Sequence, residues 1–567
     1  TRHADSLSEL RTRNMPVARA TTVPERHREV RFGSANAEFD FSGDDFGDGS
    51  EQTRLTEAYP VMERGQTFAK MRLAHGRGAA MPAMLSSGKF TLAEGKPTTA
   101  LANHDEIKKK FPTLYGGKDV KLVPAAAAVK HAPLKVGCVL SGGQAAGGHN
   151  CICGLFDYLA EFAPGSTLYG FLGGPKGVMT NSARVLDAST IDEYRNTGGF
   201  TMLASGRDKI EKPEEFKMAA DTARARGLDG LVVIGGDDSN TNAAVLAEHF
   251  KGEGLKTRVI GLPKTIDGDL KNEHCETSFG FDTAAKLFAE LVGNIMVDCE
   301  SSAKYYHFIR LMGREASHLT LEVALRTQPT ICFIGEEVKA KGQTLAALTA
   351  LIADTVADRA AKGMEYGVIL IPEGLVDFVP EMGALIREIN EVLARREAMD
   401  DSNSYEGNTA DTISDELTIA SATVYDYLPD AIKQQLLLDR DPHGNVQVAK
   451  IESERLLGAL VEAELAKRRE AGQFTAKFNS QFHYFGYEGR CPPPSNFDAN
   501  YCSALGRTAG ALIGGGCTGM MASLKGLTKP PEEWEPRGAP LTGMLCLERR
   551  KGKDKPVIRK ALVELDG

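Results

Sequence analysis

The sequence predicts a mixed α/β fold with mostly parallel sheets, an inserted helical subdomain and an extension at its start. Two observations predict the sheets: short, almost wholly apolar runs alternate with helical stretches, and most of these runs end beside glycine or aspartate. Strands this apolar are expected where helices cover both faces of a sheet. Because ligands in such sheets bind beyond the carboxyl ends of the strands, the residues that follow each run are the first candidates for function.

The strand-like runs are, in chain order, 134–140, 167–172, 231–234, 258–262, 305–311, 330–334 and 367–371. The first is followed by a helical stretch over 150–162. From 381 to about 471 the alternation stops, and charged, helical composition around a polar piece at 400–413 predicts the inserted subdomain. Residues 1–130 predict an extension, because 1–60 are polar and show little periodicity.

The composition indicates a chain of several globular domains. It has 567 residues, of which 42% are hydrophobic and 25% are charged, and this argues against wholesale disorder. The net charge of −9 does not favour nucleic-acid binding, which needs a basic face. Ten cysteines without a CxxC pair predict reduced thiols, and neither a signal peptide nor an apolar run of membrane-spanning length is recognised. These features predict a cytoplasmic protein that binds neither nucleic acid nor a membrane.

A glycine-rich segment follows the first run, with the sequence Ser-Gly-Gly-Gln-Ala-Ala-Gly-Gly from Ser141 to Gly148. Glycines between a strand and a helix allow backbone N–H groups to approach an anion, aided by the helix dipole. A tight strand-to-helix turn is an equally good interpretation of this segment alone. No GK[ST] motif is present, so it is not a Walker A loop.

Paired carboxylates follow the third run, where Asp237 and Asp238 come directly after two glycines. Carboxylates beside a phosphate site repel it unless a hard cation lies between them, and Mg²⁺ takes one or two carboxylates together with phosphate oxygens. The alternative is a turn capped by solvated acids.

The fourth run ends in a segment that combines a lysine with two aspartates: Lys264, Asp267 and Asp269. A carboxylate can act as general base toward a sugar hydroxyl, and a neighbouring lysine can neutralise charge on a transferring phosphoryl group. Phosphoryl transfer needs this combination, because its catalysis is largely positioning and charge stabilisation.

Basic and aromatic residues follow later strands. One group extends from Lys304 to Arg314, another from Tyr487 to Arg490, and Glu373 ends the run at 367–371. Arginine recognises a phosphomonoester through its planar fork, and a carboxylate can accept hydrogen bonds from sugar hydroxyls. Taken singly, each residue is more often a structural ion pair than a ligand contact.

In their order and wording these motifs resemble the phosphofructokinase family, and within it the long, diphosphate-dependent form. The resemblance extends from about 135 to 519. It implies two similar Rossmann-like α/β domains with the active site between them. The domains implied are 131–281 with 489–540 for diphosphate and Mg²⁺, and 282–395 with 470–488 and 541–567 for fructose 6-phosphate. The helical insertion would then cover 396–469.

The resemblance also implies roles for individual residues. Gly142 would contact diphosphate, Asp237 would bind Mg²⁺, and Asp267 would accept the proton of the 1-hydroxyl of fructose 6-phosphate. Lys264 and Asp238 would act in the transfer and in donor choice. Residues implied to bind the sugar phosphate, besides Asp267, are Thr265, Ile266, Met312, Gly313, Arg314, Glu373, Tyr487, Glu488, Gly489 and Arg490.

Lys304 and Tyr305 resemble a pair that reaches across a subunit interface, which implies a homodimer or homotetramer, and a regulatory subunit is a further partner to consider. The implied reaction is reversible, Mg²⁺-dependent phosphoryl transfer from diphosphate to fructose 6-phosphate in glycolysis and gluconeogenesis.

Two alternatives stay open. The first is an ATP-dependent phosphofructokinase, which would have glycine where this chain has Asp238 and Lys264. In this chain the carboxylate of Asp238 would repel the α-phosphate of a nucleotide. A non-catalytic regulatory subunit of the same fold should have lost the base or the metal carboxylate, whereas Asp237 and Asp267 are both present.

Overall fold

The computed structural model describes residues 80–399, 413–438, 446–550 and 553–565. All of them belong to one compact unit of the chain, Glu63–Gly567. Within this unit are a ten-stranded sheet, a four-stranded sheet and a two-stranded hairpin. The predicted α/β class with parallel central strands is confirmed.

The ten-stranded sheet has the strand order β1-β2-β14-β13-β7-β6-β3-β4-β5, and β8 pairs with β7. Its central strands are parallel, from β13 through β7, β6 and β3 to β4, whereas both edges are antiparallel. The bounds are β1 (Phe90–Pro97), β2 (Lys118–Pro124), β3 (Lys135–Leu140), β4 (Thr167–Phe171), β5 (Ala183–Leu186), β6 (Gly230–Gly235), β7 (Arg258–Thr265), β8 (Phe279–Gly280), β13 (Met520–Lys525) and β14 (Glu535–Pro540).

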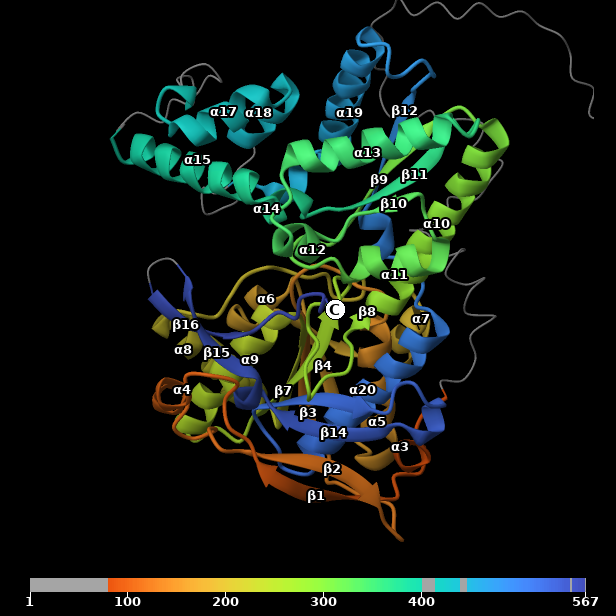
Figure 1. The fold of residues 1–567 in the computed structure, drawn as a ribbon. Helices are drawn as coiled ribbons and strands as arrows, with labels where there is room; N and C mark the ends of the chain where they lie inside the picture. The colour runs from red at the N-terminus through yellow and green to blue at the C-terminus, as the bar shows by residue number, and fades with distance from the viewer. Residues whose placement is uncertain (1–79, 400–412, 439–445, 551–552, 566–567) are drawn as a thin grey trace, which may run out of the picture. The chain divides into compact units, whose positions relative to one another are not determined.

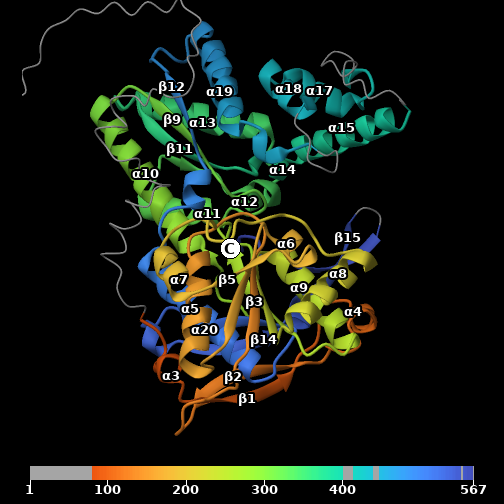
Figure 2. The same cartoon turned by 180° about the vertical axis from the view of Figure 1, so that it is seen from behind.

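Helices cover both faces of this sheet (Figures 1 and 2). The long helices α5 (Gly148–Phe162) and α20 (Asn496–Gly514) share one hydrophobic core with one face, and α8 (Pro213–Arg226) and α9 (Asp237–Gly252) share a second core with the other. This is why the central strands are apolar along their whole length. Shorter helices complete the layer: α3 (Ala83–Ser87), α4 (His104–Lys110), α6 (Pro175–Met179) and α7 (Ala188–Tyr194).

Two glycines allow α5 and α20 to pack closely. A Cβ atom on Gly154 would lie 2.2 Å from the carbonyl oxygen of Ser503, and one on Gly506 would lie 2.0 Å from that of Cys151. Neither position has room for a methyl group, so the spacing between the two helices depends on both glycines.

The four-stranded sheet is wholly parallel, with the order β10-β11-β9-β12. Ile309 and Leu311 of β9 face the core that includes α10, whereas Tyr306 and Phe308 face a separate core with α13 and α19. The strands are β9 (Tyr306–Leu311), β10 (Ile331–Cys332), β11 (Gly367–Pro372) and β12 (Ser480–Phe485), and the helices are α10 (Phe281–Ser302), α11 (His318–Thr327), α12 (Gly335–Ala340), α13 (Leu345–Ala360) and α14 (Leu375–Phe378).

The predicted helical insertion is present as α15 (Pro380–Met399), α17 (Ile419–Tyr427), α18 (Asp430–Leu438), the short η3 (Val448–Lys450) and α19 (Ser453–Glu470). It is attached to the smaller sheet by apolar packing and by a buried ion pair between Arg310 of β9 and Glu454 of α19, 2.6 Å apart. The polar piece predicted at 400–413 lies almost wholly outside the described residues.

The structure differs from the predicted boundaries at two places. Residues 90–124, predicted to belong to the extension, form β1 and β2 at the edge of the larger sheet. The hairpin β15 (Leu545–Arg550) and β16 (Lys553–Ile558) was predicted to belong with the smaller sheet, but its Leu545 and Ile558 fill the core under α9. Both segments are half-exposed or antiparallel, so they lack the continuous apolar pattern of the central strands. Residues 1–79 of the predicted extension lie outside the described residues.

Three short 3₁₀ helices are η4 (Tyr487–Arg490), η5 (Pro531–Glu533) and η6 (Leu541–Met544). All ten cysteines are free thiols, as predicted. Among the residues that the structure describes, no helix combines the length and the apolar character needed to span a bilayer.

Replacing Gly506 with alanine should destabilise the protein, because its Cβ would lie 2.0 Å from a backbone oxygen. Overpacking of this kind costs about 1–3 kcal/mol, and a thermal unfolding experiment should show a lower midpoint. Gly293→Ala in α10 is the matched control, because that Cβ would meet nothing within 4 Å and alanine favours a helix by about 1 kcal/mol over glycine. An equal midpoint for the two variants would contradict this account of the α5–α20 packing.

Candidate active site

The glycine segment after β3 forms a cradle lined by cations. Gly142 has a φ of +82°, which a residue with a side chain rarely adopts. A Cβ on Gly142 would lie 3.4 Å from Nζ of Lys264, and one on Gly143 would lie 3.1 Å from Nη1 of Arg490 and 3.7 Å from Nη2 of Arg207. Lysine and arginine groups from three parts of the chain thus face backbone that carries no side chain, an arrangement that suits a phosphate group.

The N–H of Gly142 donates a hydrogen bond to the carbonyl oxygen of Gly206 at 2.9 Å. An anion in the cradle therefore meets the side-chain cations, while this N–H holds the neighbouring loop in place.

Lys264 is the second-to-last residue of β7 and is almost fully buried, with 7% of its surface exposed. Burial lowers the pKa of its ammonium to about 8; the charges of Asp267 and Asp237 oppose this shift, and those of Arg490 and Arg207 add to it. The ammonium forms no hydrogen bond with another residue that the structure describes. A buried, unpaired amine beside a glycine loop is an electrostatic site for an anion.

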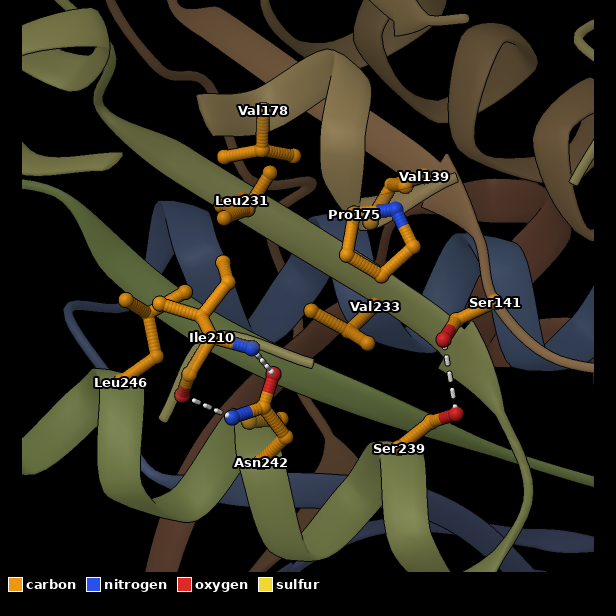
Figure 3. Close-up of a pocket in the computed structure, with 11 residues that line it drawn as sticks. Val139, Ser141, Pro175, Val178, Ile210, Leu231, Val233, Ser239, Asn242 and Leu246 are labelled. Carbon is orange, nitrogen blue, oxygen red and sulfur yellow. Dashed lines mark hydrogen bonds between the residues drawn. The ribbon is translucent and has the colours of Figure 1, made fainter. Parts of the chain in front are cut away.

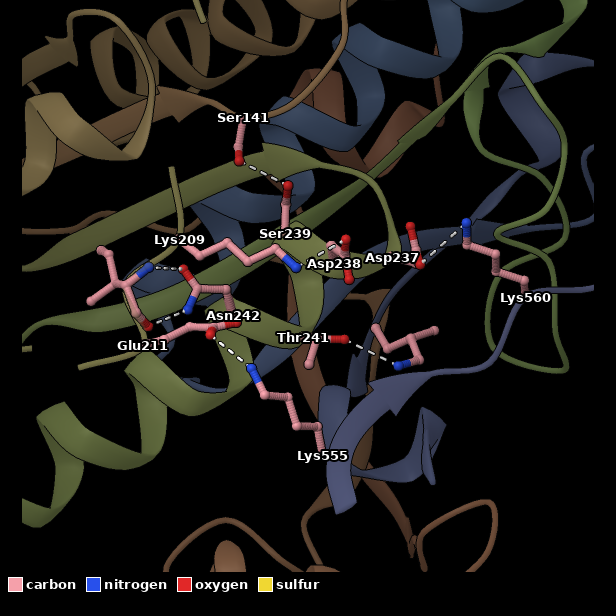
Figure 4. A network of polar contacts seen from close by, with 12 residues as sticks. Ser141, Lys209, Glu211, Asp237, Asp238, Ser239, Thr241, Asn242, Lys555 and Lys560 are labelled. Atoms are coloured by element: carbon pink, nitrogen blue, oxygen red, sulfur yellow. Dashed lines mark hydrogen bonds and ion pairs between the residues drawn. The ribbon is translucent and has the colours of Figure 1, made fainter. Parts of the chain in front are cut away.

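Asp237 and Asp238 open α9 (Figure 4). Burial raises the pKa of Asp237, and the nearby carboxylates of Asp238 and Asp269 raise it further, against the opposing charge of Lys560. Asp238 is half-exposed and pairs with Lys209, 3.1 Å away. The two neighbouring aspartates therefore have different surroundings: Asp237 lies near other carboxylates, whereas Asp238 forms an ion pair with Lys209.

The loop that carries Arg207 and Lys209 is attached to α9 by a pair of hydrogen bonds. Ile210 donates its N–H to Oδ1 of Asn242 at 3.3 Å, and Nδ2 of Asn242 donates to the carbonyl oxygen of Ile210 at 2.6 Å (Figure 3). Ser239 and Ser141 join the start of α9 to the end of β3 through hydroxyls 2.8 Å apart. These contacts hold the loop and the helix in one position.

The space between these elements is a mostly apolar cavity of about 10 Å³, lined by Val139, Ser141, Pro175, Val178, Ile210, Leu231, Val233, Ser239, Asn242, Ala243 and Leu246. A cavity of this size holds about one water molecule. It is therefore a packing gap and not a substrate site.

The loop after β7 places Asp267 and Asp269 close together. Burial raises the pKa of both carboxylates; Glu373 raises that of Asp267 further, and Asp267 raises that of Asp269. Thr265 orients the loop, because its hydroxyl accepts a hydrogen bond from the N–H of Asp267 at 3.0 Å. A carboxylate with a raised pKa is a stronger proton acceptor than an exposed one, so Asp267 is suited to act as a general base.

Glu373 follows β11 and is buried, with 4% of its surface exposed. One of its oxygens accepts a hydrogen bond from the N–H of Gly313 at 3.1 Å, and the other accepts one from the hydroxyl of Tyr484 at 2.9 Å. Arg490 contacts the sulfur of Met312 at 3.2 Å. The ends of β9, β11 and β12 and the turn η4 thus meet beside Asp267.

Arg314 follows β9 and pairs with Glu315, with 2.8 Å between Nη2 and Oε1. The charges of Asp267 and Glu373 also act on its guanidinium. Arg314 therefore lies near the predicted base, as the sequence motifs predict.

Some residues predicted to bind substrate lie away from the candidate site or do not offer a side chain to a ligand there. Lys304 and Tyr305 precede β9, whereas Met312 follows it, so the strand separates them by roughly 20 Å. The Ile266 side chain is buried in the hydrophobic core, so its backbone alone is left to face a ligand. Tyr487 is 71% exposed; Glu488 is also exposed, and Gly489 packs beside Phe288 of α10.

Three charged residues near the site were not predicted: Arg207, Glu315 and Lys560. Arg207 and Lys560 do not follow a strand-like run, whereas Glu315 lies a few residues after one and is next to the predicted Arg314. Lys560 lies after β16; burial works against its charge, but Asp237, Glu315 and Asp269 hold its pKa above the ordinary lysine value. Nothing local in the sequence marks Arg207 or Lys560, because their positions depend on the tertiary fold.

The side chains at the start of α9 fit a hard divalent cation. Asp237 offers a partly buried carboxylate with further negative charge from Asp269 beside it, and Mg²⁺ prefers such oxygen ligands. The described residues contain no group of three acidic, histidine or cysteine side chains arranged as a complete metal site.

A parallel sheet whose strand ends present a glycine cradle, a buried lysine and clustered aspartates is the framework of an enzyme that acts on phosphate groups. The phosphofructokinase family model matches residues 135–421. The chain belongs to the phosphofructokinase family.

Curated relatives match most of the chain. It is 56% identical to pyrophosphate–fructose 6-phosphate 1-phosphotransferase subunit beta 1 of Arabidopsis thaliana, over 90% of this chain and 89% of that protein. It is 50% identical to the pyrophosphate–fructose 6-phosphate 1-phosphotransferase of Porphyromonas gingivalis, over 86% and 88%. It is 38% identical to subunit alpha of the Solanum tuberosum enzyme, over 81% and 75%.

Among solved structures, the pyrophosphate-dependent phosphofructokinase from Nitrosospira multiformis has 16% sequence identity and a TM-score of 0.49, covering 72% of this chain and 83% of that one.

Proposed function

We propose that this chain transfers a phosphoryl group between diphosphate and the 1-hydroxyl of fructose 6-phosphate, in either direction. The names of relatives that are 50–56% identical support this substrate pair. The observation that carries the proposal is the buried, unpaired Lys264 facing Gly142, with Asp267 in the same loop. A short, highly charged donor would lie in the cradle, next to a base that serves the acceptor.

In the forward step, the 1-hydroxyl of the sugar attacks the terminal phosphorus of diphosphate and passes its proton to Asp267. The new P–O bond forms as the bridging P–O bond breaks, and orthophosphate leaves. Lys264 and the guanidinium groups of Arg207 and Arg490 stabilise the charge that develops on the transferred group. Asp237 would hold Mg²⁺, and the cation would supply positive charge that offsets part of the charge on the phosphate groups.

The sugar phosphate would be held from the smaller sheet. Arg314 would bind the 6-phosphate, and Glu373, already fixed by Gly313 and Tyr484, would accept hydrogen bonds from sugar hydroxyls. The larger sheet would thus bind the donor and metal and the smaller sheet the acceptor.

Lys304 and Tyr305 would reach the sugar phosphate of a second copy of the chain, because β9 separates them from Met312 within one chain. This predicts a homo-oligomer. Subunit names among the relatives support a multi-subunit assembly, and the oligomer size, a regulatory partner and the cytoplasmic location stay predictions.

Replacing Asp267 with asparagine should lower kcat by a factor of about 10²–10⁴, because the general base is lost. Equilibrium binding of fructose 6-phosphate should change little, since Arg314 and Glu373 remain. Asp221→Asn in α8, which removes an exposed partner of Arg224, is the control and should keep wild-type turnover. A kcat for the Asp267 variant within tenfold of the wild type would remove Asp267 as the base.

The donor test compares diphosphate with ATP, each with fructose 6-phosphate and Mg²⁺. The wild type should form fructose 1,6-bisphosphate with diphosphate and not with ATP, whereas Asp238→Gly should gain turnover with ATP. In that variant Lys209 loses its partner 3.1 Å away and becomes free to meet an α-phosphate. Asp238→Asn separates charge from size, since it removes the charge and keeps the volume.

Wild-type turnover with ATP would overturn this account of donor choice. Absence of turnover with both donors, from a folded sample that binds the sugar phosphate, would favour a non-catalytic subunit.

Lys264 predicts a pH dependence for diphosphate binding. Its pKa of about 8 means that the ammonium is charged below that pH and loses its charge as the pH rises through it, so its attraction for diphosphate weakens on the alkaline side. Lys264→Met lacks the charge at every pH and is the matched reference, and diphosphate itself titrates equally for both proteins. The ratio of wild-type to variant affinity should therefore fall as the pH rises through about 8; a constant ratio would contradict the role of this ammonium.

A further inference from the structure

Lys560 places an ammonium group among three carboxylates of the candidate site. Its Nζ lies 2.6 Å from Oε2 of Glu315, 3.7 Å from Oδ2 of Asp269 and 4.0 Å from Oδ2 of Asp237. Figure 4 shows the lysine approaching the start of α9 from the segment after β16. Its side chain is 22% exposed, so water screens these contacts less than those of a surface ion pair.

Hydrogen bonds fix the segment that carries Lys560. The N–H of Ala561 donates to the carbonyl oxygen of Asp269 at 2.7 Å, and the carbonyl oxygen of Ala561 lies 3.0 Å from Nε2 of His318. The N–H of Val563 donates to Oε1 of the buried Glu336 at 3.0 Å. The segment therefore joins the loop after β7 to α11 and α12 of the smaller sheet, and the position of Lys560 is held by backbone contacts.

Glu315 connects Lys560 to the predicted phosphate ligand. One of its oxygens pairs with Nη2 of Arg314 at 2.8 Å, and the other pairs with Lys560 at 2.6 Å. Without the lysine, Glu315 would keep one partner and would be free to draw Arg314 into other positions. The orientation of Arg314 thus depends on a residue that lies far away in the sequence.

We propose that Lys560 is a positioning residue that connects the two halves of the active site. Its ammonium compensates Asp237 and Asp269 when no divalent cation is bound, and it holds Glu315 so that Arg314 faces the sugar phosphate. Two measurable consequences follow: Lys560 weakens the binding of a divalent cation at Asp237 through repulsion, and it strengthens the binding of fructose 6-phosphate through Arg314. The inference rests on the roles proposed above for Asp237 and Arg314.

The test uses the full chain with Lys560→Met, which keeps the length of the side chain and removes its charge. Isothermal titration with Mn²⁺ should give a dissociation constant about 3–10 times lower than that of the wild type, because a repelling charge is gone. Titration with fructose 6-phosphate should give a dissociation constant about tenfold higher, because Arg314 loses its orientation. Lys555→Met is the matched control: Lys555 lies on β16 of the same hairpin and pairs with Glu211 at 2.8 Å, so both constants should stay at wild-type values.

Two further variants separate the consequences. Glu315→Gln should weaken sugar-phosphate binding without tightening Mn²⁺ binding, because Lys560 and its charge remain. Lys560→Arg keeps the charge and should return the Mn²⁺ dissociation constant toward the wild-type value.

Wild-type constants for Lys560→Met would overturn the proposal, and so would a lower thermal midpoint with both constants unchanged, since that result would assign the lysine to stability alone. Both titrations measure binding and not turnover. If the wild type fails to form product from diphosphate and fructose 6-phosphate, the proposed function falls, whereas the effect of Lys560 on the two ligands is still measured.

Discussion

The concentration of buried negative charge where β6 and β7 end is the constraint on which the rest of the site depends. Burial raises the pKa of Asp237, Asp267 and Asp269 alike, and neighbouring carboxylates raise each of them further. Burying uncompensated carboxylates costs several kcal/mol each, so cations must be brought to them. They come from separate parts of the chain: β7 (Lys264), the loop before α8 (Arg207), η4 (Arg490) and the segment after β16 (Lys560).

The sequence predicted most of the strands that are buried on both faces, although it missed the central strand β13, and it missed most edge strands, although it predicted β10. The runs predicted at 231–234 and 367–371 correspond to β6 and β11, in which every residue is buried. Such strands carry a continuous apolar signal. In contrast, β1 is mostly exposed and β12 is mostly half-exposed, and both include polar residues, so their residues resemble those of loops. Whether such a segment forms a strand depends on the tertiary contacts that it makes in the folded chain.

The site was predictable to the extent that its residues follow predicted strands. Asp237, Lys264 and Glu373 could be identified because the carboxyl ends of parallel strands meet at one edge. Arg207 and Lys560 could not, since no periodicity or spacing marks a residue whose function depends on which loop is folded against it. The fold also changed the interpretation of one predicted contact. The N–H of Gly142 donates its hydrogen bond to Gly206. Gly142 therefore contributes room for an anion beside the cations more than a hydrogen-bond donor to it.

The two adjacent aspartates of α9 illustrate how local geometry divides one motif between two roles. Consecutive residues of an α-helix point about 100° apart, so the side chains of Asp237 and Asp238 leave the helix in different directions. Asp237 is turned toward Asp269 and Lys560, where a divalent cation would relieve the repulsion between carboxylates. Asp238 is turned toward Lys209 on the loop that Asn242 attaches to the same helix. The ion pair with Lys209 thus holds the carboxylate of Asp238 on a different side of the helix from Asp237. Under the proposed function, Asp238 would repel a longer, nucleotide donor and leave the shorter diphosphate to Lys264.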